Sequence, residues 1–114
     1  MLKTRSRSKY NAKKADGVIE AAHFGPDGNL IWVRAYERRG PTWSDLVLLD
    51  RAALVQRLKA RKRFFVGTRR QFLASEFDLA MPLLLSQTSH GSFLVTGSGN
   101  ENIPQDQLEG IPVV

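Results

Sequence analysis

Aromatic and arginine side chains alternate along residues 30–38 in a pattern that suits nucleic acid. The four residues concerned are Trp32, Arg34, Tyr36 and Arg38. In a strand they would share one face, and Ile31, Val33 and Ala35 on the other face are expected to pack against the helix. Single-stranded nucleic acid is bound by such a face, because bases stack on rings while cations follow the backbone. Two alternatives remain open at this point: rings packed in the interior with arginines at the rim, or a contact surface for another protein.

Two further groups of cations could contact phosphates. The first group lies in residues 1–16 and comprises Lys3, Arg5, Arg7, Lys9, Lys13 and Lys14. The second lies at the end of the expected helix and along the strand that follows it, and comprises Lys59, Arg61, Lys62, Arg63, Arg69 and Arg70. Cations near a helix C-terminus are also common for a simpler reason, since they interact favourably with the helix dipole. A basic arm beside a basic patch, however, recurs in nucleic-acid-binding proteins.

The charge of the chain is strongly polarised. All 17 Lys and Arg residues lie within the first 70 positions, together with six acidic residues, which leaves a net charge of +11 there. Residues 71–114 contain five acidic residues and no Lys or Arg. A cationic surface of this density attracts polyanions, because neutralised phosphates release their counterions. The same surface would also suit an acidic protein or an anionic membrane.

Few residues suit catalysis or metal binding. The chain contains no cysteine, which excludes disulfides, thiolate metal sites and a cysteine nucleophile. Of the two histidines, His23 falls in an expected strand, and His90 follows Ser89 in a loop with no orienting carboxylate nearby in sequence. No group of histidines and carboxylates has the spacing of metal ligands. We therefore expect no enzyme, no metal and no cofactor.

Membrane insertion and secretion are not indicated by the sequence. No apolar run approaches the ~20 residues that a membrane-spanning helix needs. The N-terminal residues are basic and never develop the apolar stretch of a secretory signal. We therefore expect no transmembrane segment and a cytoplasmic location.

A sheet is needed to position the candidate residues. Val18–Phe24 and Leu30–Arg38 are β-prone, and residues 25–29 (GPDGN) should join them in a hairpin. A turn at 39–42 and a third strand over Trp43–Leu49 complete a three-strand meander.

One helix is expected after the meander. Asp50 stands where its carboxylate can cap the first turn of a helix over Arg51–Arg61. Leu54, Val55 and Leu58 form a stripe that should face the sheet.

Three further strands are expected over Arg63–Thr68, Phe77–Leu85 and Ser92–Thr96. Pro82 indicates that the second of them is an edge strand or is broken by a bulge. The expected class is α+β, with a curled, mostly antiparallel sheet that comprises the meander, the helix and two to three further strands. A small, partly closed barrel is the alternative.

The chain divides into one domain and two tails. Residues 1–16 are too polar to fold alone and are expected to form a disordered basic arm. Residues 17–96 hold most of the apolar side chains, and residues 97–114 are expected to form a flexible acidic tail. The favoured function is a small basic protein that binds RNA or single-stranded DNA through the backbone, with little sequence specificity. The alternative is an accessory or structural subunit, whose arm and tail contact acidic partner subunits.

Overall fold

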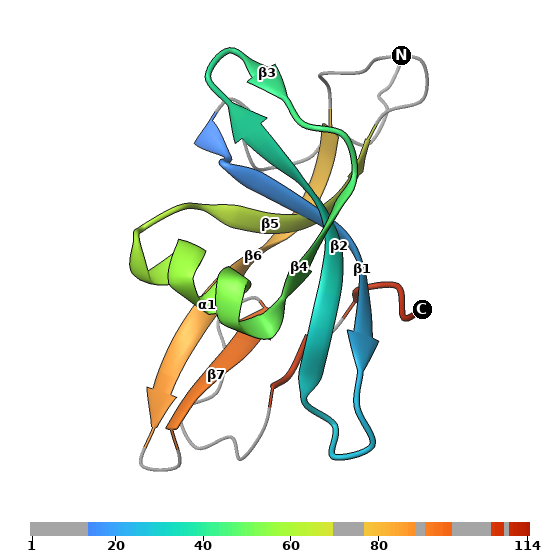
Figure 1. Cartoon of the computed structure of the whole chain (residues 1–114), viewed down its shortest axis with the longest axis vertical. Coiled ribbons are helices and arrows are strands. Elements are labelled where there is room, and N and C mark those ends of the chain that lie inside the picture. The colour runs from blue at the N-terminus through green and yellow to red at the C-terminus, as the bar shows by residue number, and fades with distance from the viewer. Residues whose placement is uncertain (1–13, 70–76, 89–90, 97–105, 109) are drawn as a thin grey trace, which may run out of the picture.

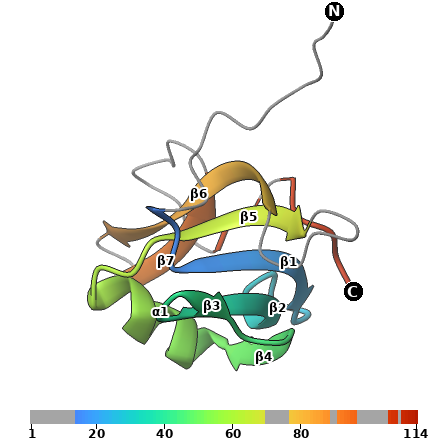
Figure 2. The same cartoon turned by 90° about the horizontal axis from the view of Figure 1, so that it is seen from above.

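The computed structural model describes residues 14–69, 77–88, 91–96, 106–108 and 110–114. These residues form one curled, mostly antiparallel sheet with a single helix, so the expected α+β class is confirmed (Figures 1 and 2). The elements are β1 (Gly17–Phe24), β2 (Leu30–Arg39), β3 (Thr42–Trp43), β4 (Val47–Asp50), α1 (Arg51–Lys59), β5 (Phe64–Arg69), β6 (Phe77–Thr88) and β7 (Gly91–Thr96).

The meander expected at the start of the domain is present. β2 pairs antiparallel with β1 on one side and with both β3 and β4 on the other. The expected third strand is therefore split into two short strands, because residues 44–46 leave the ladder. The sheet order is β3-β2-β1-β5-β6-β7, with β4 also on β2.

The β1–β5 pair is the one parallel pair among the named strands. Its register places Gly17–Ile19 beside Phe64–Val66. A parallel pair needs a long crossover connection, and α1 lies within the connection that leads into β5.

Capping and burial of α1 follow the sequence pattern. The Asp50 carboxylate accepts a hydrogen bond from the amide of Ala53 at 2.8 Å, which satisfies one of the free donors of the first turn. Leu54 is fully buried, and Val55 and Leu58 pack against the same core. The helix ends at Lys59, two residues before the expected end.

Pro82 marks the point at which β6 changes partner. Pairing with β5 runs from Arg69 opposite Phe77 to Phe65 opposite Pro82, with a bulge next to Gly67. From Leu83 onward β6 pairs with β7. Proline has no amide to donate, which favours its position at the end of a ladder.

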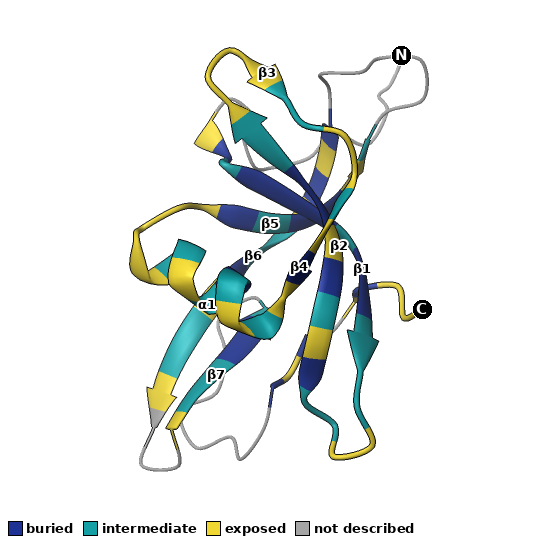
Figure 3. Cartoon of the chain, in the orientation of Figure 1, coloured by how far each residue is buried: buried dark blue, intermediate teal, exposed yellow. Residues whose placement is uncertain are grey.

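Two hydrophobic clusters lie on opposite faces of the sheet. Val18 and Ile19 are successive residues of β1 and belong to different clusters, as strand alternation requires. The larger cluster contains Leu54 of α1 and lies between the helix and the sheet. The smaller cluster comprises Ala15, Val18, Tyr36, Phe77 and Leu79. Figure 3 shows the buried positions concentrated where β1, β2 and β5 cross.

The C-terminal residues close the seam of the curled sheet between β7 and β1. Gln107 forms a parallel bridge with Val95, and Val113 forms one with Ala22 (Figure 1). Leu108 and Ile111 are buried in the larger cluster. The sequence predicts a flexible tail from residue 97, because its apolar residues are scattered singly. The described part, 106–108 and 110–114, instead packs on the domain, since those few apolar residues face an uncovered part of the core.

The N-terminal boundary also lies earlier than expected. Ala15 is buried in the smaller cluster, and the amide of Asp16 donates to the carbonyl of Arg63 at 2.7 Å. The ordered domain therefore includes the last residues of the expected arm. Residues 1–13 lie outside the described part of the chain.

Candidate nucleic-acid interface

The basic segment Lys59–Arg63 is fixed in place by the C-terminal cap of α1. The amide of Arg61 donates to the carbonyl of Leu58, and that of Lys62 donates to Arg57, both at 3.0 Å. This pair of bonds is the Schellman arrangement, which requires a left-handed residue after the helix. Arg61 takes that conformation with a φ of 65°, in the position that glycine usually occupies.

The far end of this segment is tied to the start of β1. The Asp16 carboxylate accepts from the amide of Arg63 at 2.8 Å. The carbonyl of Arg63 accepts from the amides of Asp16 and Gly17. Both ends of the basic segment are therefore held by main-chain bonds, and its cations project from a defined backbone.

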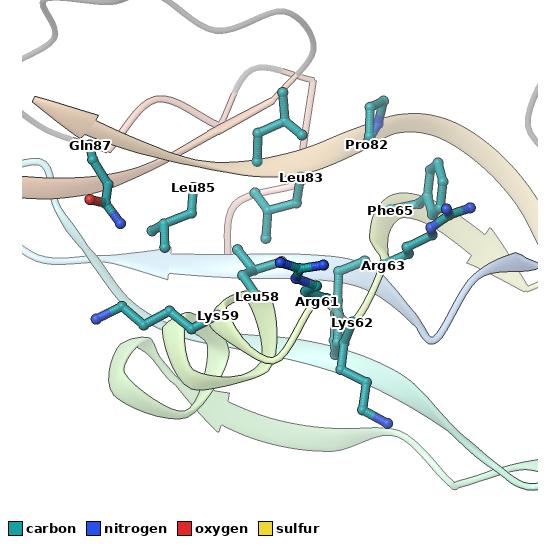
Figure 4. A pocket seen from close by; sticks show the side chains of 12 residues that line it. Leu58, Lys59, Arg61, Lys62, Arg63, Phe65, Pro82, Leu83, Leu85 and Gln87 are labelled. Carbon is teal, nitrogen blue, oxygen red and sulfur yellow. The ribbon is translucent and has the colours of Figure 1, made fainter.

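A groove with a volume of about 750 Å³ lies between this segment and β6. It is lined by Leu58, Lys59, Arg61, Lys62, Arg63, Phe64, Phe65, Pro82, Leu83, Leu84, Leu85 and Gln87. Figure 4 shows that Leu58 of α1 and Leu83 and Leu85 of β6 point into the space between the two elements. Arg63 lies beside Phe65, at the end of the groove near Pro82. The groove thus has an apolar floor and a cationic rim.

The positive charge of the rim is not neutralised within the described residues. Lys59, Arg61, Lys62 and Arg63 are all exposed. The two ion pairs in the described part of the chain lie elsewhere, between Arg51 and Asp106 and between Arg57 and Glu37. Like charges gathered beside an apolar surface create a strong positive potential, which favours an anionic ligand.

The alternating aromatic and arginine residues of β2 do not share one environment in the structure. Trp32 is half-buried and stacks on His23, with ring centroids 4.9 Å apart. Arg34 is exposed, and its guanidinium lies 5.6 Å from the Trp32 ring centroid. These two residues remain available on the outer face of β2.

Tyr36 has a different environment from Trp32. Its side chain is buried in the smaller cluster, with the guanidinium of Arg69 4.2 Å from its ring centroid and Phe77 beside it. Burial and the neighbouring Glu20 carboxylate, to which the hydroxyl donates, raise the pKa of Tyr36 above its ordinary value. The ring of Tyr36 therefore has no free face on which a base could stack.

Arg38 is also engaged within the protein. Its Nε donates to the carbonyl of Ala15 at 2.8 Å, and its guanidinium lies 4.5 Å from the centroid of Trp43. The continuous platform of alternating rings and arginines expected along β2 is thus divided into an exposed pair and an internal cluster.

The remaining candidate residues fall outside the groove. Lys14 is exposed at the start of the described chain. Arg69 lies on the other face of the sheet, over Tyr36. The candidates that lie outside the described residues are Lys3, Arg5, Arg7, Lys9, Lys13 and Arg70, together with His90.

The apolar floor of the groove is the part that sequence reasoning missed. Leu83 and Leu85 belong to a continuous apolar run over residues 79–85, which indicates a buried strand but does not show which of its faces lines a groove. Their position beside the basic segment depends on the end of the β5–β6 ladder at Pro82.

Other kinds of site find no support among the described residues. They contain no group of three His, Asp or Glu side chains that could hold a metal ion. None of their helices has the length and apolar character needed to cross a membrane. Comparisons with family models, curated proteins and solved structures find no match to the chain. Function therefore has to be inferred from the groove and its charge.

Proposed function

We propose that this protein is a non-enzymatic binding protein that holds RNA or single-stranded DNA in the groove between α1 and β6. The proposal includes a cytoplasmic location. One observation carries it: four exposed cations, with no ion pair in the described chain, lie along one side of an apolar groove that contains aromatic rings. Phosphates would contact Lys59, Arg61, Lys62 and Arg63 at the rim. Bases would lie on the apolar floor near Phe65.

A single strand fits this groove better than a duplex does. Bases in a duplex are stacked and paired, so they cannot reach an apolar floor, whereas unpaired bases can. Duplex reading by a helix is also disfavoured, because the apolar stripe of α1 is used to cover the sheet. Contacts to the phosphate backbone of a nucleic acid carry no sequence information, so we expect little preference for base sequence.

The conformation of Arg61 also supports a role for this segment. A non-glycine residue in the left-handed region is strained, and such strain concentrates at functional positions. Glycine would fit the helix cap better. A role of the Arg61 guanidinium in binding phosphate would explain why an arginine stands at this position.

The test is a titration of a fluorescent single-stranded oligonucleotide at several salt concentrations. The double variant Lys62→Gln/Arg63→Gln should weaken binding at low salt and lower the magnitude of the slope of log K against log salt. Each lost phosphate contact contributes about 0.7 to that slope on single strands. Arg34→Gln is the matched control, because Arg34 is equally exposed but lies on the outer face of β2.

Two results would contradict the proposal. One is an absence of binding at low salt by the unmodified protein. The other is an equal loss in Arg34→Gln and in the groove variant, which would show diffuse attraction rather than a site. A protein partner that stays bound after nuclease treatment would favour the accessory-subunit alternative.

A further inference from the structure

The strand β4 leaves one side of its backbone unpaired. It pairs with β2, from Trp32 opposite Asp50 to Ala35 opposite Val47, and no other named strand pairs with it. Figure 2 shows β4 at the outer margin of the sheet, beyond β2. An edge strand offers free amide and carbonyl groups on which another strand can form.

The centre of this edge lacks proline and lysine, although the strand is only four residues long and ends in Asp50. Residues 46–49 are four successive apolar residues, Leu-Val-Leu-Leu, with no proline and no cation among them. Val47 and Leu49 turn toward the core, whereas Leu46 and Leu48 are 40% and 62% exposed. Natural edges are commonly blocked by lysine, proline or a bulge. An added strand would therefore gain both a ladder and an apolar face.

The ends of the edge carry negative charge. Asp45 and Asp50 are exposed and flank the apolar run. If a second copy of the chain paired antiparallel with β4, Asp45 of one copy would lie near Asp50 of the other. Parallel pairing would place each aspartate near its own equivalent. Like charges across a ladder are destabilising, and opposite charges are favourable.

We propose that β4 is a docking edge for an extended segment of another protein, with apolar residues at its centre and Lys or Arg at both ends. The segment would add to the sheet as a strand, through main-chain hydrogen bonds. Its apolar side chains would cover Leu46 and Leu48, and its cations would pair with Asp45 and Asp50. The inference does not depend on nucleic-acid binding, because β2, β1 and β5 separate β4 from β6 in the sheet.

The test uses short synthetic peptides of alternating valine and threonine. One peptide has lysine at both ends, a second has glutamate at both ends, and a third is the lysine peptide with N-methylated alternate amides. Calorimetry should give at least tenfold tighter binding for the lysine peptide than for either of the others. Equal binding by the N-methylated peptide would overturn strand addition, and equal binding by the glutamate peptide would overturn the charge preference.

Variants locate the contact on the protein. Leu48→Lys should weaken binding of the lysine peptide at least tenfold, while the fold is retained because this side chain is mostly exposed. Leu84→Lys is the control, since Leu84 is 41% exposed but lies on β6. Equal effects of the two variants would overturn the proposal.

Charge and self-association provide two further checks. Asp45→Asn should reduce the difference between the lysine and glutamate peptides. In sedimentation experiments the free protein should remain monomeric. A dimer that Leu48→Lys dissociates would show that the edge binds a second copy, and would overturn the proposed partner.

Discussion

Asp106 is the residue that binds the C-terminal segment to the domain. Its side chain is fully buried and accepts hydrogen bonds from the amides of Leu30 and Leu94, each at 2.9 Å. Arg51 donates to both carboxylate oxygens, through Nε and Nη2, again at 2.9 Å. One carboxylate thus joins β2, β7 and the first turn of α1. A buried carboxylate is tolerated only when an opposite charge and several hydrogen bonds replace its contacts with water.

These partners also set the pH dependence of stability. Burial alone would raise the pKa of Asp106, but the hydrogen bonds from Arg51, Leu94 and Leu30 outweigh it and lower the pKa below its ordinary value. A carboxyl with a lower pKa in the folded state stabilises the protein above its unfolded pKa. That stability is lost as the pH falls through the folded pKa.

We predict that Asp106→Asn lowers the free energy of unfolding by about 2–3 kcal/mol at pH 7, because a charged, multiply bonded acceptor is lost. The difference between the variant and the original protein should shrink as the pH falls below the ordinary aspartate pKa of about 4 and through the lower folded-state pKa, because the ionised form then supplies less and less stability. Urea unfolding at pH 7 and pH 3 measures both effects. A difference that stays constant with pH would show that the charge of Asp106 is not responsible.

The two aromatic residues of β2 should respond differently to truncation. Tyr36 is buried, so Tyr36→Ala should lower the free energy of unfolding by about 3–5 kcal/mol. Trp32 is half-exposed, and we predict that Trp32→Ala costs less than half as much. Urea unfolding of both variants tests this order. A larger loss for Trp32 would mean that its stacking on His23 supports the fold more than its exposure indicates.

At the scale of single elements, the helix cap offers a test that separates folding from binding. Arg61→Gly should raise the free energy of unfolding by about 1 kcal/mol, because glycine adopts a φ of 65° without strain. Arg61→Ala keeps the strain and should give no such gain. Both variants remove the same charge, so both should bind oligonucleotide more weakly. Thermal unfolding and the oligonucleotide titration are the measurements. A loss of stability in both variants would show instead that the arginine side chain supports the fold.

The elements that sequence reasoning predicted are those fixed by local residues. Asp50 caps its helix through a residue three positions away, and residues 25–29 join β1 to β2 directly. The parallel pairing of β1 with β5 depends on residues almost fifty positions apart, and no local pattern encodes it. The candidate site divides in the same way. Its cations are close together in the sequence. Its apolar floor comes from β6, and the position of β6 beside these cations is known only once the order of the strands in the sheet is known.

At the scale of the whole molecule, the C-terminal segment should contribute strongly to stability. Leu108→Ala and Ile111→Ala each remove a buried side chain and should cost about 2–4 kcal/mol. The amides of Gln107 and Val114 donate to Leu94 and Ala22, so both should exchange slowly with solvent. Hydrogen exchange and urea unfolding provide the measurements. Rapid exchange at both amides would show that this segment is flexible, as the sequence predicts, and would contradict its packing on the domain.

Nucleic-acid binding should divide between the basic arm and the groove. Removing residues 1–13 deletes five cations but no residue of the described core, which begins at Ala15. The melting temperature should therefore change little. The slope of log K against log salt should fall by at most about 3.5 on single strands, at about 0.7 per contact.

The decisive comparison is the ratio of single-strand to duplex affinity. The arm acts by charge alone, so its removal should weaken both ligands and leave this ratio nearly unchanged. Leu83 is buried in the core, so Phe65→Ser is the better probe of the floor, because Phe65 lines the groove and is only partly buried against the smaller cluster. Urea unfolding of the variant checks that the domain is still folded. That variant should lower single-strand affinity by about 1–3 kcal/mol, with the duplex affinity and the salt slope unchanged, because stacking releases no counterions. If arm deletion alone abolished the preference for single strands, the groove would not be the site at which unpaired bases are bound.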